Sequence, residues 1–320
     1  DLIDPEAQDL LYQGDAEKWL KLAYGLKARY TMHLLKRSAN KDADMEKVLE
    51  YVNNSFESAE EQAAFDVYDA NNINPLYGFF VARAGLGASE SMRSKLAEYN
   101  DPRLSRAFIT KQGTSGKEQA PGTADNAVYA PNGTPEQGTS KYGTSLFMYS
   151  ISAPTLLLSY HELKFLEAEA LCRLERDAKS ALKDAVVAGL LNAENSFTIS
   201  RKELGKTLIN AASSITEAEA ESYFDNTIEA KYTAEPLKTT MTQKYFALWG
   251  ASGEATESYN DVRRMKGLGE NFIELKNPNS FPLRCPYGNS DTTTNAEVKA
   301  AYGNGQYVYS ENVWWAGGSR

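Results

Sequence analysis

Residues 15–37 have the sequence DAEKWLKLAYGLKARYTMHLLKR, which predicts an amphipathic helix. Asp15 can cap this helix by accepting hydrogen bonds from the amides of its first turn. A second helix is predicted for residues 42–53, and the short break between the two makes them a helical hairpin. The apolar positions of the first helix lie three and four residues apart and form one stripe, which consists of Trp19, Leu22, Ala23, Leu26 and Tyr30.

Helices of the same kind are predicted along most of the chain. No sheet is predicted, and residues 54–85 have no expected element because Asn71, Asn72, Asn74 and Pro75 interrupt them. We therefore predict a mainly α fold of stacked helical hairpins of the tetratricopeptide type, with long irregular loops. The further helices are expected at about 89–98, 160–174, 177–190, 200–210, 216–230, 236–249 (with Pro236 in its first turn) and 253–266 (ending at Gly267).

Two segments differ in composition from the helices. Residues 111–145 are rich in Gly, Thr, Ser, Pro and Asn, without an apolar period, and are expected to form a long loop insertion. Residues 270–320 are expected to be an irregular C-terminal segment. Residues 1–320 are otherwise predicted to be a single helical domain. The chain begins at Asp1 like the end of a loop, so we expect that it lacks an N-terminal portion.

Composition excludes several classes of protein. The 320 residues contain 34 basic and 43 acidic side chains, a net charge of −9, which argues against binding to nucleic acid. No apolar run approaches the roughly 20 residues of a membrane-spanning helix. Two cysteines and two histidines are too few for a disulfide framework or a zinc site.

Motifs for catalysis and cofactors are absent from the sequence. It contains no nucleophile elbow, phosphate-binding loop, dinucleotide fingerprint or zinc-protease motif, so no catalytic residue, metal or cofactor is expected. His33 and His161 are expected to be structural or surface residues. Acidic clusters such as Glu167 with Glu169, or Glu217 with Glu219 and Glu221, could serve a glycosidase, but solvated helix faces explain them better.

Aromatic residues are the unusual feature, with 19 Tyr, 12 Phe and 4 Trp. Flat rings can stack on the apolar faces of sugars while neighbouring amides bind the hydroxyls. Rings in loops are therefore the predicted ligand contacts, and the alternative is that they pack inward over the core. The candidate ligand-binding residues are Tyr129, Tyr142, Tyr149, Trp314 and Trp315.

Several stretches, in order along the chain, carry a resemblance to a known family. They are LYQGDAEKWLKLAYGLKARYTMHL at 11–34, YNDPRL at 99–104, LKFLEAEALCRL at 163–174, QKYFALWG at 243–250, EATESYNDVRRMKGLG at 254–269, NPNSFPLRCPYGNSD at 277–291 and VWW at 313–315. Together they resemble the SusD/RagB-like nutrient-binding lipoproteins of the Gram-negative outer membrane, and within them the second starch-binding-associated, SusD-like branch.

The resemblance implies a non-catalytic protein at the cell surface, held in the outer membrane by a lipid anchor outside this chain. It implies that the protein binds an oligosaccharide or a peptide and delivers it to a SusC-like TonB-dependent transporter. The motif residues are implied to be scaffold, namely Asp101, Pro102, Arg103, Asn260, Asp261, Arg263 and Arg264. Two other functions stay open: a tetratricopeptide-type adaptor that binds proteins, and a helical glycoside hydrolase.

Overall fold

The computed structural model confirms a mainly helical fold. It contains two compact units, Asp1–Glu274 and Leu275–Arg320. The residues that the structure describes are 8–82, 86–112, 118–121, 128–133, 142–251, 253–277, 280–313 and 318.

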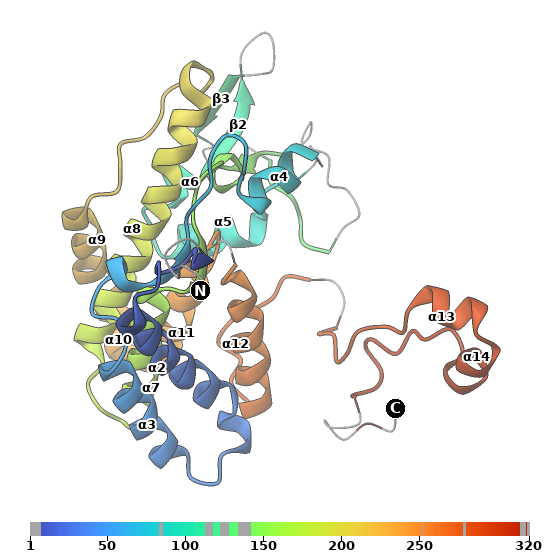
Figure 1. Ribbon diagram of the computed structural model, residues 1–320. Helices are drawn as coiled ribbons and strands as arrows, with labels where there is room; N and C mark the ends of the chain where they lie inside the picture. Colours follow the sequence, from blue (N-terminus) through green and yellow to red (C-terminus); the bar gives the residue numbers. More distant parts are fainter. Residues whose placement is uncertain are drawn as a thin grey trace, which may run out of the picture. The chain divides into compact units, whose positions relative to one another are not determined.

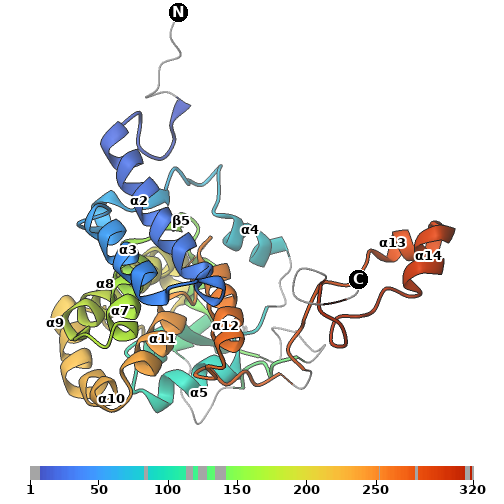
Figure 2. The same ribbon diagram turned by 90° about the horizontal axis from the view of Figure 1, so that it is seen from below.

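Helices in antiparallel pairs build the first unit (Figure 1). Helices α2, α3, α7 and α8 lie side by side in both views (Figure 1, Figure 2), as expected for stacked hairpins of the tetratricopeptide type. The helices are α2 (Ala16–His33), α3 (Lys41–Asn53), α4 (Pro75–Ala82), α5 (Glu90–Glu98), α6 (Leu104–Ala107), α7 (Tyr160–Arg173), α8 (Lys179–Leu204), α9 (Glu217–Tyr223), α10 (Glu229–Ala234), α11 (Pro236–Ala247) and α12 (Ala255–Leu268). Short helical turns are η1 (Leu35–Arg37), η2 (Ala59–Glu61), η3 (Leu146–Tyr149), η4 (Gly205–Thr207) and the π-helical η5 (Phe224–Ile228).

Helix α2 begins where the sequence predicts, because the Asp15 carboxylate accepts from the amides of Glu17 and Lys18. The predicted apolar stripe is confirmed for Leu22 and Leu26, which pack in the core, and is wrong for its other three residues. Leu22 is 4% exposed, whereas Trp19 is 42% exposed, and Ala23 and Tyr30 also face solvent. The buried face instead consists of Leu22, Gly25, Ala28, Arg29 and Met32.

Close packing explains this phase of α2. A Cβ atom on Gly25 would lie 2.3 Å from Leu158 Cδ2, so only glycine lets the helix approach the segment before α7 this closely. Small residues therefore mark the buried face, while the large Trp19 indole packs edge-on against Tyr12, with 5.5 Å between ring centroids. Trp19 Nε1 also donates to Asp9 Oδ2 over 2.6 Å.

Other predicted helices differ in their bounds. Helix α8 continues to Leu204, so the separate helix predicted at 200–210 is wrong. The helix expected at 216–230 contains the π-helical turn η5 between α9 and α10. Pro236 does begin α11, and Gly269, in the left-handed region at φ +82°, ends α12 in place of the predicted Gly267.

The expectation that 54–85 has no regular element is also wrong. Asn74 begins helix α4 by accepting from the Leu76 amide over 2.8 Å, and Pro75 occupies the first helical position. The asparagine and proline that look like breakers are thus a helix start.

Two small antiparallel sheets correct the prediction of no sheet. Strand β1 (Ala63–Phe65) pairs with β5 (Thr155–Leu158), and β2 (Phe108–Gln112) pairs with both β3 (Glu118–Pro121) and β4 (Thr144–Ser145). None of these strands exceeds five residues, which is too short for an alternating pattern to stand out in the sequence.

Buried ion pairs join the helices of the first unit and contain most of the motif residues. Arg103 donates to both carboxylate oxygens of Asp101, over 2.8 and 2.6 Å, and to the Phe246 carbonyl. Asp261 lies 2.8 Å from Lys244 Nζ and 2.7 Å from an Arg264 nitrogen. Removing one partner of such a pair leaves a buried charge uncompensated, which fits the scaffold role implied for Asp101, Arg103, Asp261 and Arg264.

The second unit contains two short helices, α13 (Asn289–Thr294) and α14 (Ala296–Tyr302), in the segment predicted to be irregular. The Tyr287 and Tyr302 rings stack with their centroids 4.3 Å apart. The Leu283 amide donates to the Val308 carbonyl over 2.8 Å and closes the segment.

Candidate functional site

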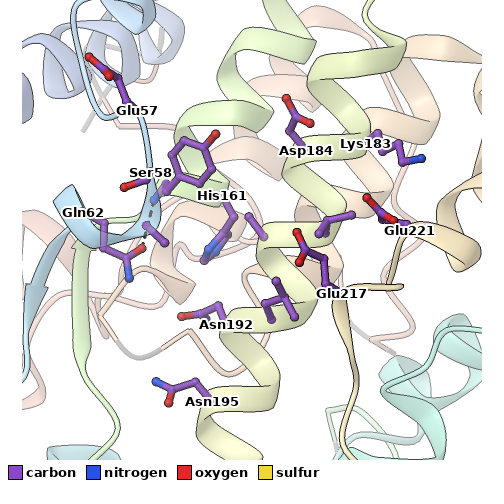
Figure 3. Close-up of a pocket in the computed structure, with 15 residues that line it drawn as sticks. Glu57, Ser58, Gln62, His161, Lys183, Asp184, Asn192, Asn195, Glu217 and Glu221 are labelled. Carbon is purple, nitrogen blue, oxygen red and sulfur yellow. Dashed lines mark hydrogen bonds between the residues drawn. The ribbon is translucent and has the colours of Figure 1, made fainter. Parts of the chain in front are cut away.

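A pocket of about 480 Å³ lies along helix α8, and we call it the α8 pocket (Figure 3). Four segments far apart in the sequence form it: the turn before β1, the start of α7, one face of α8, and α9. Its lining residues are Glu57, Ser58, Ala59, Gln62, Tyr160, His161, Lys183, Asp184, Val187, Ala188, Leu191, Asn192, Asn195, Glu217 and Glu221.

Helical geometry supplies one wall of the pocket. The residues from Lys183 to Asn195 recur three and four positions apart, so a single face of α8 presents apolar side chains flanked by amides. Figure 3 shows Ser58 and Gln62 on the opposite side of the pocket from Glu217 and Glu221. On its other side, α8 packs closely against α11, because a Cβ atom on Gly189 would lie 2.9 Å from the Ala247 Cβ atom. This close contact fixes the position of the wall.

Side-chain amides are the uncommitted polar groups of the pocket. Gln62 Oε1 accepts from the Tyr160 amide over 3.2 Å, which orients the side chain. Its NH2 group, and both polar atoms of Asn192 and Asn195, make no hydrogen bond within the described part of the chain. An amide both donates and accepts, so these three side chains can each bind a hydroxyl in either sense.

The charged groups of the pocket are mostly acidic. Lys183 is the one ammonium among the described residues that line it, and its Nζ lies 2.8 and 3.0 Å from the two carboxylate oxygens of Asp225. Asp184 lies 3.5 Å from Lys164 Nζ, which is closer, at 2.5 Å, to Glu167. The pocket therefore contains carboxylates that are only weakly compensated.

His161 lies at the buried end of the pocket and is 1% exposed. Burial lowers the pKa of His161 to about 4, so the imidazole is neutral near pH 7. Its Nε2 lies 3.8 Å from Glu254 Oε2, and neither atom has a hydrogen-bond partner among the described residues. Burial, followed by the charge of Glu162, raises the pKa of Glu254 well above its usual range.

The Glu254 carboxyl is held in place by its other oxygen. Glu254 Oε1 accepts from the Ser159 amide and, over 3.2 Å, from Arg29 Nη2. Arg29 in turn donates from Nε to Glu162 Oε1 over 3.0 Å. The acidic pair Glu162 and Glu254 therefore has one guanidinium between them, which compensates one carboxylate charge and favours protonation of the other.

The tyrosines predicted to contact a ligand are not exposed. Tyr129 is 3% and Tyr142 is 7% exposed, so the expectation of open ring faces is wrong for both. The Tyr129 ring packs edge-on against Phe108 at 5.1 Å, and the Arg93 guanidinium lies 5.3 Å from its centroid. A Cβ on Gly143 would come within 2.6 Å of the Tyr129 ring, so the ring packs closely against this backbone.

Tyr149 is half-buried and packs edge-on against Phe80 of α4, with centroids 5.0 Å apart. Trp314 and Trp315 lie outside the described residues. None of the three described tyrosines lines the α8 pocket, and whether any of the five predicted contacts touches a ligand stays a prediction.

Some pocket residues had a signal in the sequence and others had none. Glu217 and Glu221 belong to one of the acidic clusters in the sequence, and both line the pocket. The other cluster does not: Glu169 is buried against Arg264, and Glu167 pairs with Lys164. Gln62, Asn192 and Asn195 carried no signal, because nothing local distinguishes them from other polar residues of a loop or helix.

The described residues contain neither a metal-binding cluster nor a membrane-spanning helix. No group of three or more His, Cys, Asp or Glu side chains there is placed to hold a metal ion. No described helix has the length and apolarity needed to cross a bilayer. Cys172 is half-buried and Cys285 is exposed, and both are free thiols.

Comparison with known proteins places the chain in a class of outer-membrane binding proteins. A family model described as "Starch-binding associating with outer membrane" matches residues 2–287. The chain belongs to this SusD-like family. No match was found among curated proteins.

Solved structures agree with this assignment. A SusD/RagB family protein from Bacteroides thetaiotaomicron is 66% identical, with a TM-score of 0.91 over 100% of this chain and 69% of its own. A SusD homologue from Bacteroides fragilis is 20% identical, with a TM-score of 0.65 over 92% of this chain and 66% of its own, and this likeness concerns the fold. The chain thus spans about two thirds of the length of these relatives.

Proposed function

We propose that this protein is a non-catalytic receptor that binds an oligosaccharide in the α8 pocket and passes it to a TonB-dependent transporter. Membership in a starch-binding family of the outer membrane supports glycan as the ligand. The observation that carries the choice of site is the set of uncommitted amides, Gln62, Asn192 and Asn195, around a pocket of about 480 Å³. A lipid anchor outside this chain would hold the receptor at the cell surface.

The lining of the pocket suits a sugar chain. Val187, Ala188 and Leu191 provide apolar surface against which the C–H faces of a pyranose ring can pack. The Tyr160 ring lines the same space, and burial raises its pKa, so the phenol stays protonated and can donate. Hydroxyls at the ring edges then meet the amides, which exchange donor and acceptor roles as the sugar requires.

Binding without hydrolysis fits the carboxylates of the pocket. A glycosidase needs one carboxylic acid that stays protonated near neutral pH, and burial is the usual way to achieve this. Glu217 and Glu221 are exposed, so their surroundings do not supply that burial. Glu254 has a raised pKa, but it is 1% exposed and accepts a hydrogen bond from the Ser159 amide, so a sugar in the pocket does not reach it.

The test is isothermal titration of the full chain with oligosaccharides of defined length, comparing wild type with the variant N192A/N195A. We expect the variant to lose at least about tenfold in affinity, because two hydrogen-bonding groups worth roughly 1 kcal/mol each are removed. N53A, on the exposed end of α3, is the control and should bind like wild type.

Three outcomes would contradict parts of the proposal. Unchanged affinity of N192A/N195A would move the site away from the α8 pocket. Binding of peptides and not of sugars would show that the ligand is a peptide. Release of reducing sugar by the wild type would contradict the absence of catalysis and support the glycoside hydrolase.

Transfer to the transporter needs its own measurement. Copurification of a TonB-dependent transporter with the tagged protein is expected. Copurification of other proteins only, with no response to sugars, would support a protein-binding adaptor instead. The five aromatic residues, Tyr129, Tyr142, Tyr149, Trp314 and Trp315, stay proposed as further contacts, and alanine variants in the same titration test them.

A further inference from the structure

We infer that the α8 pocket selects oligosaccharides that carry a basic amine, such as glucosamine chains, over neutral ones, and excludes acidic ones. This inference rests on the proposed function and names the class of sugar that the site would take. Four carboxylates line the pocket, those of Glu57, Asp184, Glu217 and Glu221, and Lys183 is the one ammonium that the described part of the chain adds to this lining.

The lysines near the pocket do not neutralise it. Lys183 is held mainly by Asp225, which does not line the pocket, and Glu221 attracts it more weakly. Lys21 lies 3.3 Å from Glu57 but closer, at 2.7 Å, to Glu61. Likewise, Lys164 Nζ lies 3.5 Å from Asp184 but closer, at 2.5 Å, to Glu167, which does not line the pocket. Each of these ammonium groups therefore faces a carboxylate outside the pocket at least as closely as one inside it.

Glu217 and Glu221 are the most available carboxylates. They are four residues apart on α9, so they lie on one face of the helix, and like charges at this spacing repel each other. Neither forms an ion pair with any residue that the structure describes. Figure 3 shows both side chains along the same wall of the pocket. An ammonium placed between them would relieve the repulsion.

His161 does not offset the acidity of this lining. It lines the pocket and is 1% exposed, and its Nε2 atom lies 3.8 Å from Glu254 Oε2, a residue outside the lining. Because the imidazole is neutral, it adds no positive charge that would attract an acidic sugar or repel a basic one.

Hydrogen-bonding capacity favours an amine over a hydroxyl at the carboxylates. An ionised carboxylate only accepts, and an ammonium group only donates, three times. Hydrogen bonds between two charged groups are also stronger than those to a neutral hydroxyl. Since these carboxylates are solvated, the gain is modest, and we expect a preference of roughly fivefold to tenfold at low ionic strength.

The test compares three sugars of equal length on the full chain: a glucosamine hexamer, its fully N-acetylated form, and a galacturonic acid hexamer. The pH is kept below the pKa of the sugar amine. We expect the glucosamine hexamer to bind about fivefold to tenfold more tightly than the acetylated one, with a difference that shrinks as salt is added. The galacturonic acid hexamer should bind weakest of the three.

The charge variant E217Q/E221Q assigns the preference to the pocket, because it keeps the shape of both side chains. It should bind the glucosamine and acetylated hexamers about equally, while E17Q/E50Q, which removes two exposed charges from other helices, should keep the wild-type preference. Melting curves of both variants check that they fold.

The outcomes separate this inference from the proposed function. Equal binding of the basic and neutral hexamers by wild type, or an unchanged preference in E217Q/E221Q, overturns the inference and leaves glycan binding intact. Failure of every hexamer to bind would count against the proposed function itself.

Discussion

Replacing either member of the buried pair His161 and Glu254 should change how stability depends on pH, in opposite directions. The usual pKa values are 6.5 for histidine and 4.5 for glutamate. Between these values an unfolded chain carries a charged imidazolium and a charged carboxylate. In the folded protein burial lowers the pKa of His161 to about 4 and raises that of Glu254, so both side chains are neutral.

Folding therefore releases one proton from His161 and binds one at Glu254. The Glu254 contribution to stability is complete below pH 4.5 and is lost as pH rises through its folded pKa. The His161 contribution is complete above pH 6.5 and is lost as pH falls toward about 4. Between pH 4.5 and 6.5 the two effects oppose each other, so the pair adds less pH dependence to the wild type than either group alone.

Each variant removes one of the two titrating groups, so the pH dependence of the other is no longer opposed. In H161Q only Glu254 titrates, so stability should fall with rising pH by about 1.4 kcal/mol per pH unit relative to wild type. In E254Q only His161 titrates, so stability should rise with pH relative to wild type. The glutamine side chain of E254Q can still accept from the Ser159 amide through its carbonyl oxygen, as the Glu254 carboxyl does.

The assay is urea unfolding of the three proteins at several values within this pH interval. Titrating groups that do not interact with the pair contribute equally to all three proteins, so their effects cancel in the differences from wild type. Parallel curves, or two variants whose slopes have the same sign, would refute the assignment of a neutral imidazole beside a protonated carboxyl.

The other predictions concern packing. W19A should cost about 1 kcal/mol in thermal or urea unfolding, because it removes one hydrogen bond and one ring contact, whereas L22A should cost about 2–5 kcal/mol; a larger loss for W19A would mean that its indole is buried. Y129A should cost about 3–5 kcal/mol, as expected for a buried ring, and a melting temperature equal to wild type would show that the ring is exposed. R103A should cost about 3–5 kcal/mol, because it leaves the Asp101 carboxylate buried without its partner, and an unchanged urea midpoint would show that the pair is solvated.

Local signals in the sequence predict most of the scaffold. Asp15 and Pro236 begin helices as their chemistry requires, and the order of helices is typical of paired hairpins. The phase of α2 was not predictable in the same way, because its buried face depends on Gly25 approaching Leu158, a contact made only in the folded protein. Residue size alone points to the wrong side of that helix.

The candidate site was less accessible to prediction for the same reason. Gln62, Asn192 and Glu217 are far apart in the sequence, and the packing of α8 against α7 and α9 helps to bring them around one pocket. The burial of the tyrosines is not predictable from the sequence, because a Gly- and Thr-rich neighbourhood indicates a loop but not the direction in which its rings face. Tyr129 lies in such a neighbourhood and is nevertheless packed against Phe108.

A crystal structure of the protein with its preferred oligosaccharide tests the central claim most directly. The account predicts a sugar bound in the α8 pocket, with hydroxyls within hydrogen-bond distance of Asn192 and Asn195 and all glycosidic bonds intact. A sugar bound at another surface while the α8 pocket holds only water, or a cleaved sugar within it, would contradict the account.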